Sequence, residues 1–242
     1  MSVNKELKKL YEKYWDDVMI EGKKVIKDTT IKIDHPANPF LLAIDEKKYE
    51  EANFKVMIFG QETWGWDGDF GKTIDELMGH YAKSKKDYLD GRNKGFSQGY
   101  HFFQEEITEK YRNKKFIFIW NNISKIGRNE AKGQTKNIKD LEQRYFPVIK
   151  EELEILKPDM VIFLTGNRDS CIRFNFPSVQ FEKYHKNATL KSFNGKIKFQ
   201  PAYRVITSKL PIKSVKVYHP SYFGGFNNIK NDALDLLLSD TV

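Results

Sequence analysis

Four short polar segments follow four apolar runs and contain side chains able to do chemistry. They are Gln61–Trp66, Asn121–Ser124, Thr165–Arg168 and His219–Tyr222. Together they supply a carboxylate, carboxamides, an imidazole and aromatic rings. An imidazole and a carboxylate can act as an acid/base pair, and a carboxamide can donate and accept hydrogen bonds in one plane. The pattern therefore predicts a site that handles a polar substrate.

The apolar runs predict the elements that position these segments. Each run is continuous, which is typical of a parallel strand covered on both faces. The predicted strands are Lys55–Gln61, Lys115–Asn121, Met160–Gly166 and Val215–Pro220, and the helices predicted from apolar spacing are Asn4–Met19, Ile138–Leu156 and Ile229–Leu238. Strands alternating with helices predict a three-layer α/β/α fold with a short, mainly four-stranded parallel sheet.

Ligands of open α/β sheets bind beyond the carboxyl ends of the strands, so we expect the four polar segments to face one cleft. Residues 179–206 are expected to form an extra hairpin or an irregular insertion. The 242 residues fit a single domain, in which residues 1–37 form an N-terminal helix and lead-in.

Composition narrows the classes of function. The lone Cys171 excludes an internal disulfide and a thiolate zinc site, and no histidine spacing typical of a metal site is present. We therefore expect no metal. No glycine-rich phosphate loop of the dinucleotide or P-loop type is present, which argues against a nucleotide cofactor, and we expect no cofactor. The chain shows no apolar signal core and no membrane-spanning run, which favours a cytoplasmic protein without a membrane partner. We expect it to be a monomer. The net charge of +8 is compatible with a nucleic-acid partner.

The order of four motifs resembles the uracil-DNA glycosylase superfamily. Gly60–Trp64 resembles the family's Gly-Gln-Asp-Pro-Tyr motif, and Phe96-Ser97 resembles the Phe-Ser that bears its base-stacking ring. An asparagine after the second strand and the His219-Pro220-Ser221 motif complete the set. The resemblance spans roughly residues 38–238, and it implies an α/β protein that hydrolyses the N-glycosidic bond of uracil or a related damaged base in DNA.

The resemblance also implies roles for individual residues. His219 would stabilise the departing base anion, and Glu62 would orient water and support the sugar cation. Both are therefore candidate catalytic residues. The expected base-binding residues are Gln61, Trp64, Phe96 and Asn122, and the expected DNA-binding residues are Ser221 and Phe223, the latter as an apolar wedge.

Two departures from the family motif keep other functions open. Glu62 replaces an aspartate, and Thr63 replaces a proline that would fix the turn. Asn121 competes with Asn122 for the base-reading role. The alternatives are a nucleic-acid- or nucleotide-binding protein of the same fold without catalysis, and an unrelated hydrolase that uses Glu62 and His219 as an acid/base pair.

Overall fold

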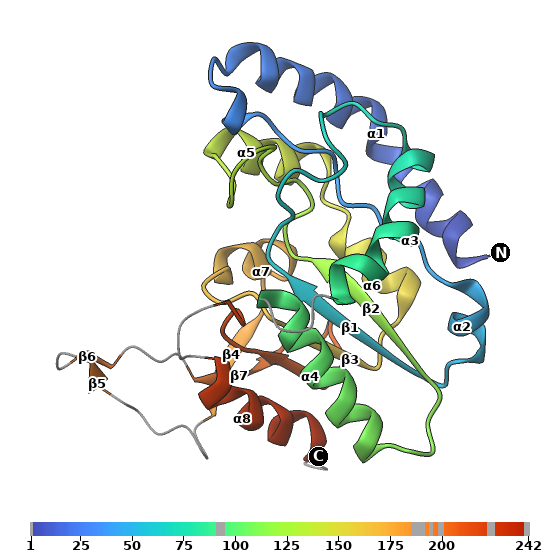
Figure 1. Ribbon diagram of the computed structural model, residues 1–242, viewed down its shortest axis with the longest axis vertical. Helices are drawn as coiled ribbons and strands as arrows, with labels where there is room; N and C mark the ends of the chain where they lie inside the picture. Colours follow the sequence, from blue (N-terminus) through green and yellow to red (C-terminus); the bar gives the residue numbers. More distant parts are fainter. Residues whose placement is uncertain are drawn as a thin grey trace. The chain divides into compact units, whose positions relative to one another are not determined.

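The computed structural model describes residues 2–90, 95–184, 192–193, 196–197, 201–221 and 226–239 (Figure 1). The chain divides into two compact units, and each is assembled from three segments. Unit 1 consists of Met1–Tyr49, Gln61–Lys85 and Asn122–Lys157, and unit 2 consists of Glu50–Gly60, Lys86–Asn121 and Pro158–Val242. The chain passes from unit 2 into unit 1 after Gly60 and again after Asn121.

Unit 2 is built on a six-stranded, mostly parallel sheet. Its strands, in spatial order, are β2 (Phe116–Asn122), β1 (Phe54–Gly60), β3 (Met160–Phe163), β8 (Lys213–Lys216), β7 (Ala202–Ile206) and β4 (Gln180–Tyr184). The expectation of four main strands was too low. Residues 179–206 contribute β4 and β7, which pair antiparallel with each other and extend the sheet from β8. A separate two-stranded pair joins β5 (Ser192–Phe193) to β6 (Lys196–Ile197).

The parallel strands β1, β3 and β8 end at one edge of this sheet. Val56 pairs with Met160 and Phe59 with Phe163, and Phe163 also pairs with Lys216. The Phe59 and Phe163 rings stack at 4.9 Å between centroids. Because parallel strands run in one direction, the segments that follow them all leave the sheet at its carboxyl edge.

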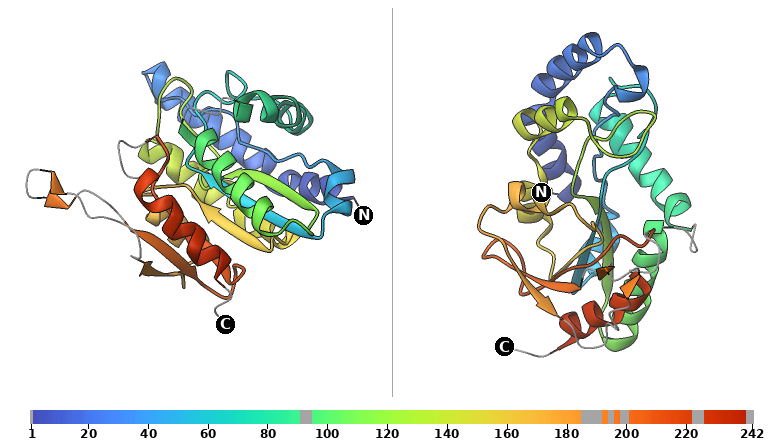
Figure 2. Two further views of the ribbon diagram at one scale, coloured as in Figure 1. Left: turned by 60° about the horizontal axis from the view of Figure 1, so that its bottom comes forward. Right: turned by 90° about the vertical axis from the view of Figure 1, so that its left-hand side faces the viewer.

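Helices cover both faces of the unit 2 sheet. Figure 2 shows α8 (Phe226–Leu238) lying across β7 and β8, with α4 (Gly95–Lys110) beside it. On this side Lys213 Nζ donates to the Leu237 carbonyl at 2.8 Å. Lys216, three residues further along the strand, faces the opposite side and is paired with the first residue of α7 (Asp169–Asn175). Unit 2 by itself is therefore an α/β/α arrangement.

Unit 1 is helical and centres on α1 (Val3–Asp28). Figure 1 shows α1 running along α5 (Lys136–Tyr145), and α1 also packs on α6 (Ile149–Leu156). The single helix expected over 138–156 is therefore two helices. Pro147 causes the break, because its ring excludes a helical hydrogen bond and disfavours helical backbone at Phe146. The buried Phe146 ring contacts three aromatic residues of α1, namely Tyr11, Tyr14 and Trp15.

Three smaller or bridging elements complete the described chain. They are the 3-10 helix η1 (Lys32–Asp34), α2 (Glu46–Glu51) and α3 (Ile74–Asp90). The last two begin in unit 1 and end in unit 2. Within the described ranges, no helix combines the length and apolar character that crossing a bilayer requires.

Candidate functional site

In unit 1 the loop that follows β1 lies against the loop that follows β2. The Ser124 amide donates to the Gln61 carbonyl at 2.9 Å, and the Gly65 amide donates to the Arg128 carbonyl at 3.1 Å. A side chain at Gly127 would place its Cβ 1.9 Å from the Thr63 carbonyl oxygen. The structure thus joins two of the four motifs, and it does so through backbone contacts that require a glycine at position 127.

Glu62 is half-buried, and its carboxylate binds to the loop that follows β2. Its Oε1 accepts a hydrogen bond from the Gly133 amide at 2.8 Å. Thr63, the residue that replaces the motif proline, is buried, whereas Trp64 is 64 % exposed. An exposed indole on a loop can contact a ligand, but its packing in this unit does not position it tightly.

Two adjacent asparagines end β2, and their side chains leave opposite faces of the strand. Both are buried, and Asn121 directs its Nδ2 toward Met57 Sδ on β1 at 3.7 Å. The Asn121 side chain is therefore in contact with a residue of the neighbouring strand. This contact favours Asn122 as the residue with the candidate base-reading role, and the role itself stays a prediction.

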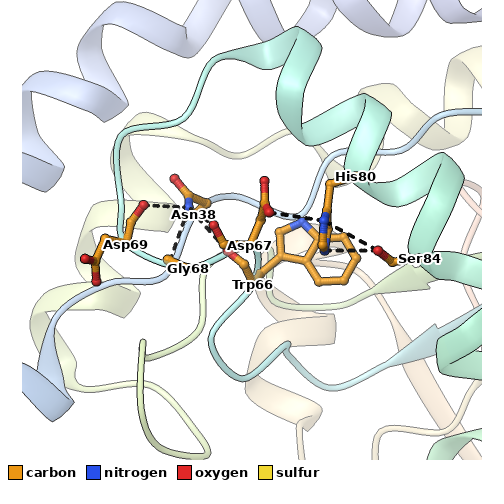
Figure 3. A network of polar contacts seen from close by, with 7 residues as sticks. All are labelled: Asn38, Trp66, Asp67, Gly68, Asp69, His80 and Ser84. Atoms are coloured by element: carbon orange, nitrogen blue, oxygen red, sulfur yellow. Dashed lines mark hydrogen bonds and ion pairs between the residues drawn. The ribbon is translucent and has the colours of Figure 1, made fainter.

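A polar network beside the Trp64 loop centres on Asn38. The fully buried Asn38 directs its Nδ2 at four consecutive carbonyl oxygens, those of residues 66–69, at 2.9–3.3 Å (Figure 3). Its Oδ1 accepts from the Gly71 and Lys72 amides at 2.8 and 3.1 Å. One carboxamide thus fixes the path of the whole 66–72 loop.

The same network holds an Asp67–His80–Ser84 array. His80 Nδ1 lies 3.1 Å from Asp67 Oδ1, and Trp66 packs edge-on against the imidazole at 4.5 Å (Figure 3). Ser84 Oγ lies 3.4 and 3.3 Å from the two ring nitrogens. A hydroxyl almost equidistant from both nitrogens is in line with neither lone pair, so the array lacks the nucleophile–base geometry of a catalytic triad.

In unit 2 the motif His219-Pro220-Ser221 follows β8. His219 is half-buried, and its Nδ1 accepts a hydrogen bond from the Ser221 amide at 3.2 Å. A neutral imidazole has one donor and one acceptor nitrogen, so a ring that accepts at Nδ1 presents Nε2–H as its donor. The local backbone thereby selects the tautomer that can donate to an anion.

The start of α4 packs against this motif and brings the Phe96-Ser97 pair beside it. A Cβ on Gly95 would lie 2.4 Å from Ser221 Oγ, and one on Gly99 would lie 2.4 Å from Pro220 Cγ. Gly95 also has a φ of +55°, in the left-handed region that favours glycine. Unit 2 thus joins the other two motifs.

The Phe96 ring is 7 % exposed and belongs to an aromatic cluster. Trp120, on β2, lies 5.8 Å from Phe96 and stacks on Tyr88 at 4.5 Å with an interplanar angle of 13°. Tyr88 is the exposed member of this cluster. Phe96 is therefore held in place by packing, as a preorganised stacking surface must be.

A buried ionic network in unit 1 was not expected from the sequence. The fully buried Lys125 donates to both Glu152 oxygens at 2.8 and 3.0 Å, and the Tyr11 hydroxyl donates to the same carboxylate at 2.7 Å. Burial lowers the pKa of Lys125 and raises that of Tyr11. Burial also raises the pKa of Glu142 to about 7, although the Ile126 amide donates to its carboxylate.

The remaining candidate residues are placed as follows. Ser221 is exposed, and Phe223 lies outside the described residues. Across the described ranges, no group of three or more His, Cys, Asp or Glu side chains is arranged to hold a metal ion. Sequence reasoning missed Asn38, Lys125 and Glu152, whose importance comes from burial.

No protein-family model matches this sequence, and no curated protein is detectably similar to it, so the candidate roles depend on the residues themselves.

Proposed function

We propose that this protein is a DNA glycosylase that hydrolyses the N-glycosidic bond of uracil or a related damaged base. The observation that carries the proposal is the hydrogen bond from the Ser221 amide to His219 Nδ1. It makes Nε2 the protonated nitrogen of the neutral ring, at the carboxyl edge of a parallel sheet, where ligands of such folds bind.

The chemistry requires such a donor. Cleavage of the glycosidic bond leaves negative charge on the departing base and positive charge on the sugar. A fixed N–H aimed at the developing anion stabilises the transition state more than the ground state, and loss of one such donor typically slows a reaction about 100- to 1,000-fold. His219 is assigned this role.

The packing of α4 on Pro220 and Ser221 supports a second assignment. It holds Phe96 next to the histidine motif, as a ring that stacks on an extruded base must be held. Gln61, Trp64 and Asn122 are assigned to base recognition. Ser221 and Phe223 are assigned to the DNA strand, and Glu62 to water and the sugar cation.

The carboxylate of Glu62 favours one alternative function. Its hydrogen bond with the Gly133 amide, at 2.8 Å, gives this side chain a structural task, because it ties the loop after β1 to the loop after β2. If that is its only task, the chain is a nucleic-acid- or nucleotide-binding protein of the same architecture that lacks glycosylase catalysis. A purely structural role and a catalytic role of Glu62 make different predictions for the substitution Glu62→Gln.

The test is incubation with uracil-containing single- and double-stranded oligonucleotides, followed by alkaline cleavage at abasic sites. We expect excision by the wild type and a loss of about 100- to 1,000-fold in His219→Ala, with oligonucleotide binding nearly unchanged. His35→Ala is the matched control, because the His35 ring lies 2.9 Å from the Thr29 carbonyl oxygen, in the lead-in of unit 1. Wild-type activity that His219→Ala does not impair would overturn the proposal.

Glu62→Gln separates the two candidate functions. A catalytic carboxylate predicts slow excision after its charge is removed, because the amide keeps the shape and loses the charge. Absence of excision in the wild type, together with retained oligonucleotide binding, would favour the non-catalytic protein.

A further inference from the structure

The positive charge of this protein is concentrated in one stretch of sequence. Between Glu182 and Asp232 the chain contains ten lysine and arginine residues and no aspartate or glutamate. This stretch of 49 residues therefore carries +10, while the rest of the chain carries −2. A local surplus of this size attracts polyanions far more effectively than the same charge spread evenly.

The stretch includes β7 and β8 of unit 2, and the strand register sorts its side chains between two faces. Tyr203 lies opposite both Lys216 on β8 and Lys183 on β4, so these three residues share one face. Phe181 lies two residues from Lys183 and shares that face too. Helix α8 covers the other face, and α7 lies on this one.

Lys216 is the buried residue of this face. It is almost fully buried and forms an ion pair with Asp169. Its ammonium nitrogen lies 4.4 Å from the Tyr203 ring centroid and 4.9 Å from that of Phe181. Cation–π attraction is strongest when the cation is desolvated, so the buried lysine fixes the positions of both rings.

The outer part of the face consists of two half-exposed rings with exposed cations next to them. The Phe181 and Tyr203 centroids lie 6.3 Å apart in a T-shaped arrangement. Arg173 of α7 is exposed, and its guanidinium carbon lies 4.8 Å from the Phe181 ring centroid. Lys183 is exposed on the edge strand β4.

Acidic side chains near this face are directed elsewhere or neutralised. Asp169 is paired with Lys216. Glu182 alternates to the opposite face of β4, where it lies 3.7 Å from Arg204. The exposed charge contributed by Arg173 and Lys183 is therefore not cancelled by these two carboxylates.

We propose that Arg173, Phe181, Lys183, Tyr203 and Lys216 form a binding surface for single-stranded DNA, named here the cationic–aromatic face. Arg173 and Lys183 contact phosphates, Phe181 and Tyr203 stack on bases, and Lys216 positions the two rings. Exposed cations interleaved with aromatic rings are the usual means of holding a single strand without sequence preference. Its two rings lie on β4 and β7, the antiparallel extension of the sheet, and Lys216 lies on the adjacent strand β8.

The inference and the proposed function share only the polynucleotide partner. They are tested separately, because binding is measured on DNA without uracil. The probe is a fluorescent oligothymidylate of 20 nucleotides, titrated with wild-type protein by anisotropy at several salt concentrations. Lys183→Gln should weaken binding about fivefold near 0.1 M salt and reduce the salt slope by about 0.7, the value for one phosphate contact on a single strand. Lys23→Gln is the control, since it neutralises an exposed lysine of α1 in unit 1.

Phe181→Leu tests stacking, because leucine keeps an apolar side chain and removes the ring. Base–aromatic stacking predicts binding weaker by about fivefold or more with an unchanged salt slope. Oligothymidylate binding that is equal in wild type, Lys183→Gln and Phe181→Leu would overturn the inference, and so would an equal loss in Lys23→Gln. Oligothymidylate binding with these losses, in a protein that excises no base, would support the face and count against the proposed glycosylase.

Discussion

Asn38→Asp is an almost isosteric change that should destabilise unit 1 strongly. The wild-type Nδ2 offers two protons to four backbone carbonyls, of which the closest, that of Asp69, lies at 2.9 Å. An ionised aspartate would place an oxygen there instead, and its other oxygen would still accept from the Gly71 and Lys72 amides. The substitution therefore removes two donors and adds repulsion between oxygen atoms, while it preserves the volume of the side chain.

The magnitude follows from the two lost donors. Leaving a buried polar group without its hydrogen bond costs about 1–3 kcal/mol, so two such losses predict about 2–6 kcal/mol. At about 2–4 °C per kcal/mol for a chain of this size, the melting temperature should fall by at least about 4 °C. The introduced carboxyl group has its pKa raised by burial among carbonyls, so its contribution to stability is lost as the pH rises through that value. The deficit should thus be smaller at pH 4 than at pH 7.

The assay is urea unfolding at pH 4 and pH 7, followed by circular dichroism and by tryptophan fluorescence, to which the buried Trp66 of this loop contributes. Asn113→Asp, at an exposed position, is the control for the added charge. An Asn38→Asp protein as stable as wild type at pH 7 would refute the reasoning, since it would mean that the four carbonyls do not depend on Asn38.

Three further changes test the packing of unit 1. Glu142→Gln should raise the stability of the protein above pH 7. The folded-state pKa of Glu142, about 7, exceeds its unfolded value, so wild-type stability falls by up to about 3 kcal/mol as the pH rises from 4.5 through 7. Urea titrations of the variant should lack this fall. Gly127→Ala should cost about 1–3 kcal/mol in the same titrations, because its Cβ would meet the Thr63 carbonyl; a neutral result would show that the two loops separate easily. Lys125→Met should lower stability by about 3–5 kcal/mol, because it leaves Glu152 buried without its cation. The double variant Lys125→Met/Glu152→Leu should recover much of that loss. Equal stability of the two variants would contradict the pairing.

Local sequence patterns determined the strands of the parallel sheet and their order along the chain. Runs such as Val56–Phe59 and Met160–Phe163 are apolar on both faces of the strand, and only a sheet covered by helices on both sides accommodates such runs. The identity of the residues that follow each strand, including Glu62 and His219, is likewise a property of the sequence. The effect of Pro147 on the helix was visible in the sequence, but the strong apolar spacing of 138–156 obscured it.

Long-range pairing decided what local patterns could not. Residues 180–184 and 202–206 have ordinary strand composition, and they join the main sheet only because 202–206 pairs with β8 and 180–184 pairs with 202–206. That strand pairing also places Phe181 and Tyr203 beside Lys216. The charge surplus is visible in the sequence, but only the pairing shows which side chains share one face of the sheet.

Burial is the other property that only the tertiary structure decides. Nothing in the sequence around Asn38, Lys125 or Glu152 distinguishes these polar residues from solvated ones. Enclosure by the fold makes each of their hydrogen bonds necessary, because a buried polar group without a partner is costly. The hydrogen bond between the Ser221 amide and His219 Nδ1 is of the same kind: the sequence supplies the histidine, and the backbone conformation selects the nitrogen that donates.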